Sequence, residues 1–119
     1  STTITLYGLD GTVSKTISTN DANDIMFSNN SQRFYYTSGK RLNCLSKDIQ
    51  ENKTLWFADD TYSFFTDSGK ILSIALSKDD VTLAYTTHNG WSKVVRARYG
   101  VELITCIMQP NDRLSIKKN

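Results

Sequence analysis

The segment DSGKILSIALSKDDVTLAYTT, residues 67–87, constrains the fold more than any other part of this chain. It places a stretch that can form a short amphipathic helix directly before a β-strand pattern, VTLAYTT at 81–87. Asp67 or Ser68 would cap such a helix, and the apolar positions within 71–76 would give it a buried stripe. One helix among strands would make the chain mainly β with a single helical element.

The same segment also fits a β-hairpin. In that interpretation TYSFFT (61–66) and KILSIALS (70–77) flank a turn at 67–69, and alternating side chains fit a strand. A short internal similarity supports the hairpin, because YYTSGKRLNCLSKD from Tyr35 resembles FFTDSGKILSIALSKD from Phe64. Local patterns alone do not decide between helix and hairpin.

The rest of the chain has the rhythm of an all-β protein, with apolar runs separated by turn signals about every ten residues. Its 119 residues suit one domain over residues 1–119, and no linker divides it. The predicted strands are 3–8, 12–18, 33–38, 41–46, 54–59, 81–87, 91–98 and 101–108. The polar stretch 19–32 is expected to be a loop that Ile25–Phe27 pin to the core.

The charge and hydropathy of the chain exclude two classes of protein. A net charge of +2 and a pI near 8.5 are too mild for a nucleic-acid binder, which shows a denser basic stripe. No apolar run approaches the roughly 18 residues that span a membrane. The chain begins at Ser1, as after loss of a signal peptide or of an initiator methionine, and the sequence does not separate the two.

The titratable and thiol residues indicate no catalytic or metal site. Cys44 and Cys106 are either two buried thiols or one disulfide, which would close a loop of roughly 60 residues and stabilise by about 3–4 kcal/mol. His88 is the only histidine, so a zinc site or a nucleophile–histidine pair lacks its partners, and we expect an exposed turn residue. The acidic pairs Asp59-Asp60 and Asp79-Asp80 fit caps and turns better than paired catalytic carboxylates. We therefore expect neither an enzyme nor a cofactor.

The order of features from Arg33 to Cys106 resembles the B subunits of pentameric bacterial A/B toxins, in the branch of pertussis toxin and subtilase cytotoxin. RFYYTSGK precedes a strand with a cysteine, NCLSK, and Trp56 follows about a dozen residues later. Next come the possible helix DSGKILSIALSKD, the strand VTLAY, the turn NGW and the last core strand VELITC. The resemblance favours a helix over 66–78.

This resemblance implies an OB-fold, a small Greek-key barrel that is mainly β with one helix (α+β), assembling into a ring. The expected assembly is a homo- or hetero-pentamer that carries a catalytic A subunit and binds host cell-surface glycans, sialoglycans among them. The implied protein is secreted after its signal peptide is removed, acts at the host cell surface, and has neither a nucleic-acid partner nor a membrane span. A Cys44–Cys106 disulfide would fit this fold.

The resemblance also implies a glycan site in the hairpin YYTSGKR. Sugars are bound by aromatic faces together with hydroxyl and cationic groups, and a sialic acid carboxylate favours Lys or Arg. The candidate glycan-binding residues, all within one turn, are Tyr35, Tyr36, Ser38, Lys40 and Arg41.

A second interpretation needs no toxin role. ILSIALSKDDVTLAYTTHNGW resembles a blade segment of a WD-repeat propeller, in which an apolar strand, a Ser-x-Asp turn and a second strand recur. The chain would then be an all-β repeat module that serves as an interaction scaffold. The presence or absence of a helix over 66–78 separates the two interpretations.

Overall fold

The computed structural model describes residues 2–46, 54–60, 69–97 and 102–106, and they contain strands and turns only. The ten strands are β1 (Thr2–Tyr7), β2 (Val13–Thr19), β3 (Ile25–Phe27), β4 (Arg33–Ser38), β5 (Arg41–Ser46), β6 (Thr54–Asp59), β7 (Ile71–Leu76), β8 (Thr82–Thr87), β9 (Ser92–Arg96) and β10 (Glu102–Cys106). Within these ranges no helix is long and apolar enough to cross a membrane.

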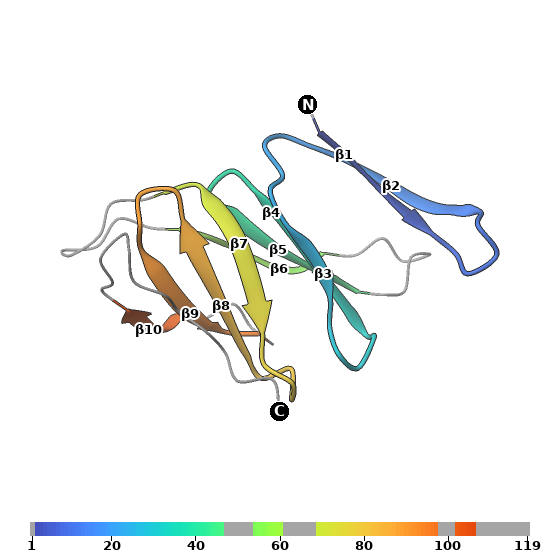
Figure 1. Ribbon diagram of the computed structural model, residues 1–119. Coiled ribbons are helices and arrows are strands. Elements are labelled where there is room, and N and C mark those ends of the chain that lie inside the picture. The colour runs from blue at the N-terminus through green and yellow to red at the C-terminus, as the bar shows by residue number, and fades with distance from the viewer. Residues whose placement is uncertain (1, 47–53, 61–68, 98–101, 107–119) are drawn as a thin grey trace.

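The strands form three separate antiparallel sheets. The hairpin β1–β2 stands alone, and two four-stranded sheets follow with the orders β3-β4-β5-β6 and β7-β8-β9-β10. Each four-stranded sheet is a meander, in which every strand pairs with its neighbour in sequence. Figure 1 shows the three sheets as successive layers, with the first four-stranded sheet between the hairpin and the second sheet.

The first four-stranded sheet is apolar on both faces, because successive side chains on a strand point to opposite sides. On β4, Tyr35 is 1% exposed and belongs to the core cluster shared with Ile71 and Leu83 of the second sheet. Its neighbour Phe34 is 2% exposed and clusters instead with Ile4 of the hairpin. Burial of these apolar side chains, worth about 1.5–3 kcal/mol each, holds the three layers together.

Tight turns set the register of the strands. The predicted hairpin of 33–38 and 41–46 is confirmed, with Ser38 opposite Arg41 across a two-residue turn. Gly39 in that turn has φ of 58°, a left-handed conformation that glycine adopts without steric cost. Asp80 takes a similar φ of 63° in the turn between β7 and β8.

The predicted helix over 66–78 is wrong. Residues 71–76 form strand β7, which pairs antiparallel with β8 and places Ala75 opposite Ala84. The register shifts between Ile71 and Ser73, so the buried positions do not alternate regularly along the strand. That irregularity, together with the bonds that β8 supplies, explains why an apolar run with helix-like spacing is a strand here.

The predicted Greek-key barrel is also wrong, because the described strands form two open meanders and a hairpin. The alternative hairpin of 61–66 with 70–77 is only partly described. Its second half overlaps β7, and residues 61–68 lie outside the described ranges.

Candidate functional site

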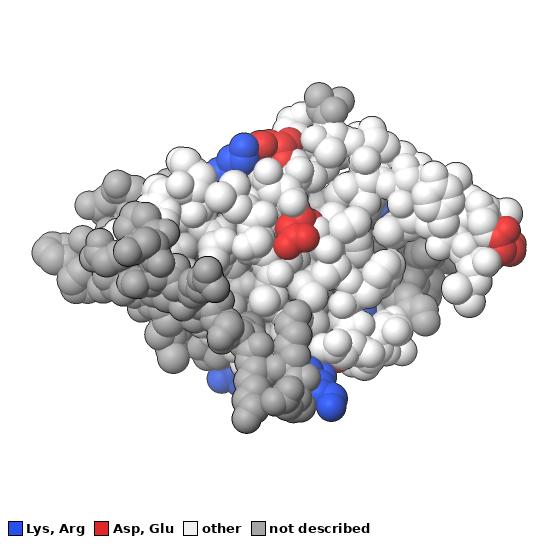
Figure 2. Space-filling model, in the orientation of Figure 1, with Lys and Arg blue, Asp and Glu red and all other residues white. Residues whose placement is uncertain are grey.

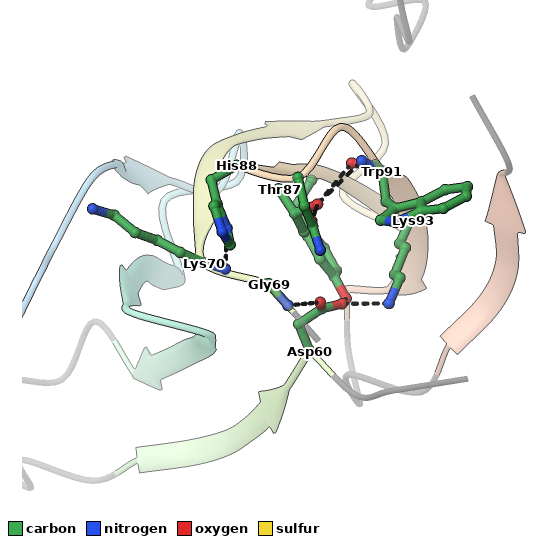
Figure 3. A network of polar contacts seen from close by, with 9 residues as sticks. Asp60, Gly69, Lys70, Thr87, His88, Trp91 and Lys93 are labelled. Atoms are coloured by element: carbon green, nitrogen blue, oxygen red, sulfur yellow. Dashed lines mark hydrogen bonds and ion pairs between the residues drawn. The ribbon is translucent and has the colours of Figure 1, made fainter. Parts of the chain in front are cut away.

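A buried carboxylate joins the two four-stranded sheets. Asp60 directly follows β6, and 1% of it is exposed. Its Oδ1 accepts hydrogen bonds from the Tyr85 hydroxyl at 2.7 Å and from Lys93 Nζ at 2.6 Å, and its Oδ2 accepts one from the Gly69 amide at 2.7 Å. Figure 3 shows Gly69 and Lys93 approaching the Asp60 carboxylate from two sides. We call Asp60, Gly69, Tyr85 and Lys93 the polar joint.

The polar joint is almost fully removed from water. The side chains of Lys93 and Asp60 are 2% and 0% exposed. A buried ion pair is tolerated only when further hydrogen bonds satisfy its remaining atoms, and the Tyr85 hydroxyl and Gly69 amide do this. Tyr85 and Lys93 belong to the second four-stranded sheet and Gly69 shortly precedes it, whereas Asp60 directly follows the last strand of the first four-stranded sheet. The arrangement therefore fixes how the sheets meet.

The turn between β8 and β9 lies beside the polar joint. His88 Nδ1 accepts a hydrogen bond from the Lys70 amide at 2.9 Å, and the His88 amide donates to the Lys70 carbonyl at 2.8 Å. The Thr87 hydroxyl accepts a hydrogen bond from the Trp91 amide at 3.1 Å and closes the turn (Figure 3). His88 is exposed in this turn, as predicted.

A second carboxylate ties the sheets together at the turn between β7 and β8. Asp80 accepts hydrogen bonds from the amides of Asn29 and Asn30, at 2.7 Å and 2.8 Å, and so joins the turn after β3 to the turn after β7. The Asn29 side chain also donates to the Ser77 carbonyl at 2.9 Å. A polar hollow of about 240 Å³ adjoins this contact.

The acidic pairs take structural roles. Asp79 accepts hydrogen bonds from the Ser77 hydroxyl at 2.6 Å and the Val81 amide at 3.1 Å, and these bonds hold its pKa below the usual value. Asp59 accepts a hydrogen bond from Arg41 at 2.8 Å, which lowers the Asp59 pKa. The cap-and-turn prediction therefore holds for Asp79, whereas Asp60 is the buried centre of the polar joint. Sequence reasoning missed this role, and its only signal was a lysine in the strand pattern of residues 92–96.

Three of the predicted glycan-binding residues, Tyr36, Ser38 and Arg41, share one face of the first sheet, because Ser38 lies opposite Arg41 and two residues from Tyr36. Tyr35 is buried between the two sheets, and Tyr36 points to the opposite face of β4, in the cluster with the hairpin. The Ser38 hydroxyl donates to the Asn20 carbonyl at 2.7 Å. Lys40 is exposed, and Arg41 lies 4.0 Å from the ring centre of Phe57. Their role in glycan binding stays a prediction.

The thiol of Cys44 is buried in the core between the sheets, and Cys44 is free in the structure. Burial raises its pKa to about 11, and burial also raises the pKa of the neighbouring Tyr35 hydroxyl to about 12. The side chain of Cys106 lies outside the described part of the chain, so the predicted pairing of Cys44 with Cys106 stays a prediction.

An apolar cleft separates the tip of the β1–β2 hairpin from the first sheet. It has a volume of about 420 Å³. Its floor is aromatic, because the rings of Phe27 and Phe34 are 5.4 Å apart between centroids. The apolar lining comprises Leu6, Tyr7, Leu9, Phe27, Phe34 and Leu45. A cleft of this size and lining matches the usual properties of a ligand site.

Comparison with known proteins identifies the fold. No protein family model matches the chain, and no curated protein matches it in sequence. Solved structures do match: the WD40 repeats of RRP9 superpose with a TM-score of 0.66 at 13% identity, over 90% of this chain and 29% of that one. The structure of U3-55K gives 0.66 at 13% identity, over 90% and 30%. A protein from Lactobacillus plantarum gives 0.59 at 18% identity, over 90% and 34%.

These likenesses show the fold alone, and the chain spans about a third of the length of the structures it matches. The two four-stranded meanders resemble consecutive blades of a WD40 propeller. The predicted identity as a pentameric, lectin-like toxin B subunit is therefore wrong. The features quoted for it from Arg33 to Cys106 are strands and turns wherever the structure describes them.

Proposed function

We propose that this chain forms part of a propeller-type all-β module that binds other proteins and carries no catalytic role. The observation that carries this proposal is a WD40-like stack of sheets whose described buried polar groups bond across the stack. Asp60 and Lys93 bond each other, and Asp80 bonds the turn after β3. The described surface also carries large exposed apolar side chains that a partner could cover.

Several of the exposed apolar residues lie on or beside the β1–β2 hairpin. Tyr7 and Val13 are 66% and 59% exposed, Leu9 is fully exposed, and Phe27 on β3 is 53% exposed. Figure 2 shows that the described surface of this region is largely uncharged on the face drawn, with acidic atoms at the far tip. Exposed apolar patches of this kind mark interaction sites more often than solvated surface.

Co-purification followed by reconstitution tests the proposal. A protein captured from extracts of the source organism would be purified and titrated against this chain by isothermal calorimetry. We expect saturable binding that weakens about tenfold or more on Leu9→Ser with Val13→Ser, because truncation of central apolar contacts typically costs over 1 kcal/mol each.

The matched control is Leu72→Ser, which removes a leucine that is 41% exposed on β7, in the second four-stranded sheet. We expect it to leave the affinity within twofold. A chain that binds no purified protein, or that binds glycans on an array and nothing else, would contradict the proposal.

A further inference from the structure

We propose that the cleft between the β1–β2 hairpin and the first sheet binds an extended peptide segment of a partner. A large apolar side chain would enter the cleft, and a neighbouring carboxylate would pair with Lys15. This inference rests on the proposed function and adds to it the chemistry of the partner.

The floor and walls of the cleft select an apolar side chain. Phe27 and Phe34 both line the cleft, with ring centroids 5.4 Å apart, and Tyr36, outside the lining, stacks on Phe34 at 5.7 Å. Leu6 of the hairpin faces this aromatic run from the other wall. An aromatic or large aliphatic side chain of a peptide would gain both apolar burial and ring contacts here.

The position of Lys15 selects a carboxylate. On β2 the half-buried positions are Lys15, Ile17 and Thr19, so Lys15 shares the inward face with Ile17, which packs on the core. Lys15 pairs with Leu6 in register and lines the cleft. Partial burial lowers its pKa, as expected for an ammonium group that loses water.

Lys15 also differs from the cations that hold the fold together. Arg41, Lys70 and Lys93 each form an ion pair with an aspartate. Lys15 forms none with the carboxylates that the structure describes. A lysine held against an apolar wall, with no acidic partner among the described residues, provides the charge complementarity for one incoming carboxylate.

The single charge favours a peptide over a lipid surface. Binding to anionic membranes depends on clusters of about four to eight basic residues. Lys15 is the only charged residue that lines the described cleft. The hydroxyls of Ser14 and Ser31, which also line the cleft, offer hydrogen bonds that suit a peptide backbone.

The test uses two capped synthetic peptides, Ser-Gly-Glu-Phe-Glu-Gly-Ser and the same peptide with both glutamates replaced by glutamine. Each is titrated into the isotope-labelled full chain up to about 5 mM and followed by amide chemical shifts. We expect shifts at cleft amides, including those of Lys15 and Phe34. The glutamate peptide should bind about threefold more tightly or better, as for a partly exposed ion pair.

Two pairs of variants separate the contributions. Lys15→Gln should abolish the preference for glutamate, whereas Lys78→Gln, at an exposed lysine of the β7–β8 turn, should preserve it. Phe27→Ala should weaken both peptides about fivefold or more, whereas Leu72→Ala should weaken neither. Equal affinity for the two peptides, shifts confined to another surface, or no shift at 5 mM would overturn the inference.

Failure here and failure of the proposed function are distinguishable. If a reconstituted protein partner binds and the cleft amides do not respond to it, the module interpretation stands and the cleft assignment falls. If Lys15→Gln changes thermal stability but not the peptide preference, Lys15 contributes to folding only, and the assignment falls as well.

Discussion

Substitution of Lys93 by methionine tests the polar joint most severely. Methionine keeps the length and apolar stem of lysine but removes the charge that lies 2.6 Å from Asp60 Oδ1. The Asp60 side chain is 0% exposed, so its charge would stay buried without the Lys93 ammonium group. Removal of one member of a buried pair typically costs about 3–5 kcal/mol.

For a chain of this size, the expected loss corresponds to a fall in melting temperature of about 10–25 °C. Urea unfolding followed by tryptophan fluorescence would measure the free energy directly, provided that the slope with denaturant is unchanged. The second variant combines Lys93→Met with Asp60→Asn, which removes the buried charge. We expect it to recover at least about 1 kcal/mol relative to Lys93→Met, since no unpaired charge then remains.

The surface pair of Arg41 and Asp59 provides the matched control. It has similar geometry, with 2.8 Å between Arg41 Nε and Asp59 Oδ1, but its side chains are 45% and 30% exposed. Arg41→Met should cost less than about 1 kcal/mol because water screens the pair. The reasoning would be refuted if Lys93→Met cost no more than Arg41→Met, or if adding Asp60→Asn gave no recovery.

Three further predictions follow from the described contacts. Asp80→Ala should lower the free energy of unfolding by about 1–3 kcal/mol in urea, because two amides lose their acceptor and alanine must take a positive φ, whereas Asp80→Asn should cost less; equal losses would contradict this. Because the pKa of Asp59 is lowered in the folded chain, its charge stabilises the fold at pH values above its ordinary pKa of 3.8, and this contribution is lost as pH falls through the lower folded pKa. Asp59→Asn should therefore flatten the dependence of melting temperature on pH below about 4, and an unchanged slope would contradict this. The Cys44 thiol, with a pKa of about 11, should resist iodoacetamide at pH 8 in the native chain and react in urea, as peptide mass mapping would show; equal labelling in both would contradict its burial.

The strands with clear turns could be predicted from the sequence. The segments 33–38, 41–46 and 54–59 match β4, β5 and β6, because Gly39-Lys40 and the polar stretch after Ser46 mark their ends. The stretch 19–32 was expected to be a loop with a buried triplet. It contains the short strand β3, in which Ile25 and Phe27 are 46% and 53% exposed.

The two similar glycine–lysine segments occupy different positions in their sheets, which the sequence similarity did not predict. GKRLNCLS leads into β5, the third strand of its sheet, whereas GKILSIALS leads into β7, the first strand of the next sheet. The two segments therefore occupy different positions in their blades.

The candidate site was beyond sequence reasoning because it depends on contacts between layers. Asp60 and Lys93 are far apart in sequence and meet only when the two sheets stack. The cleft likewise arises because the tip of β1–β2 diverges from the sheet that carries Phe27 and Phe34. Periodicity within one strand carries no information about either arrangement.

The most direct test of the central claim is a nuclear Overhauser spectrum over residues 71–76 combined with hydrogen exchange. A propeller-type stack predicts cross-strand contacts between Ala75 and Ala84. It also predicts slow exchange of the Ile71 amide, which donates to the Gly39 carbonyl of the neighbouring sheet at 2.9 Å. Sequential amide–amide contacts and contacts between residues three apart over 71–76, with fast exchange at Ile71, would instead show a helix and contradict the fold on which the proposed function rests.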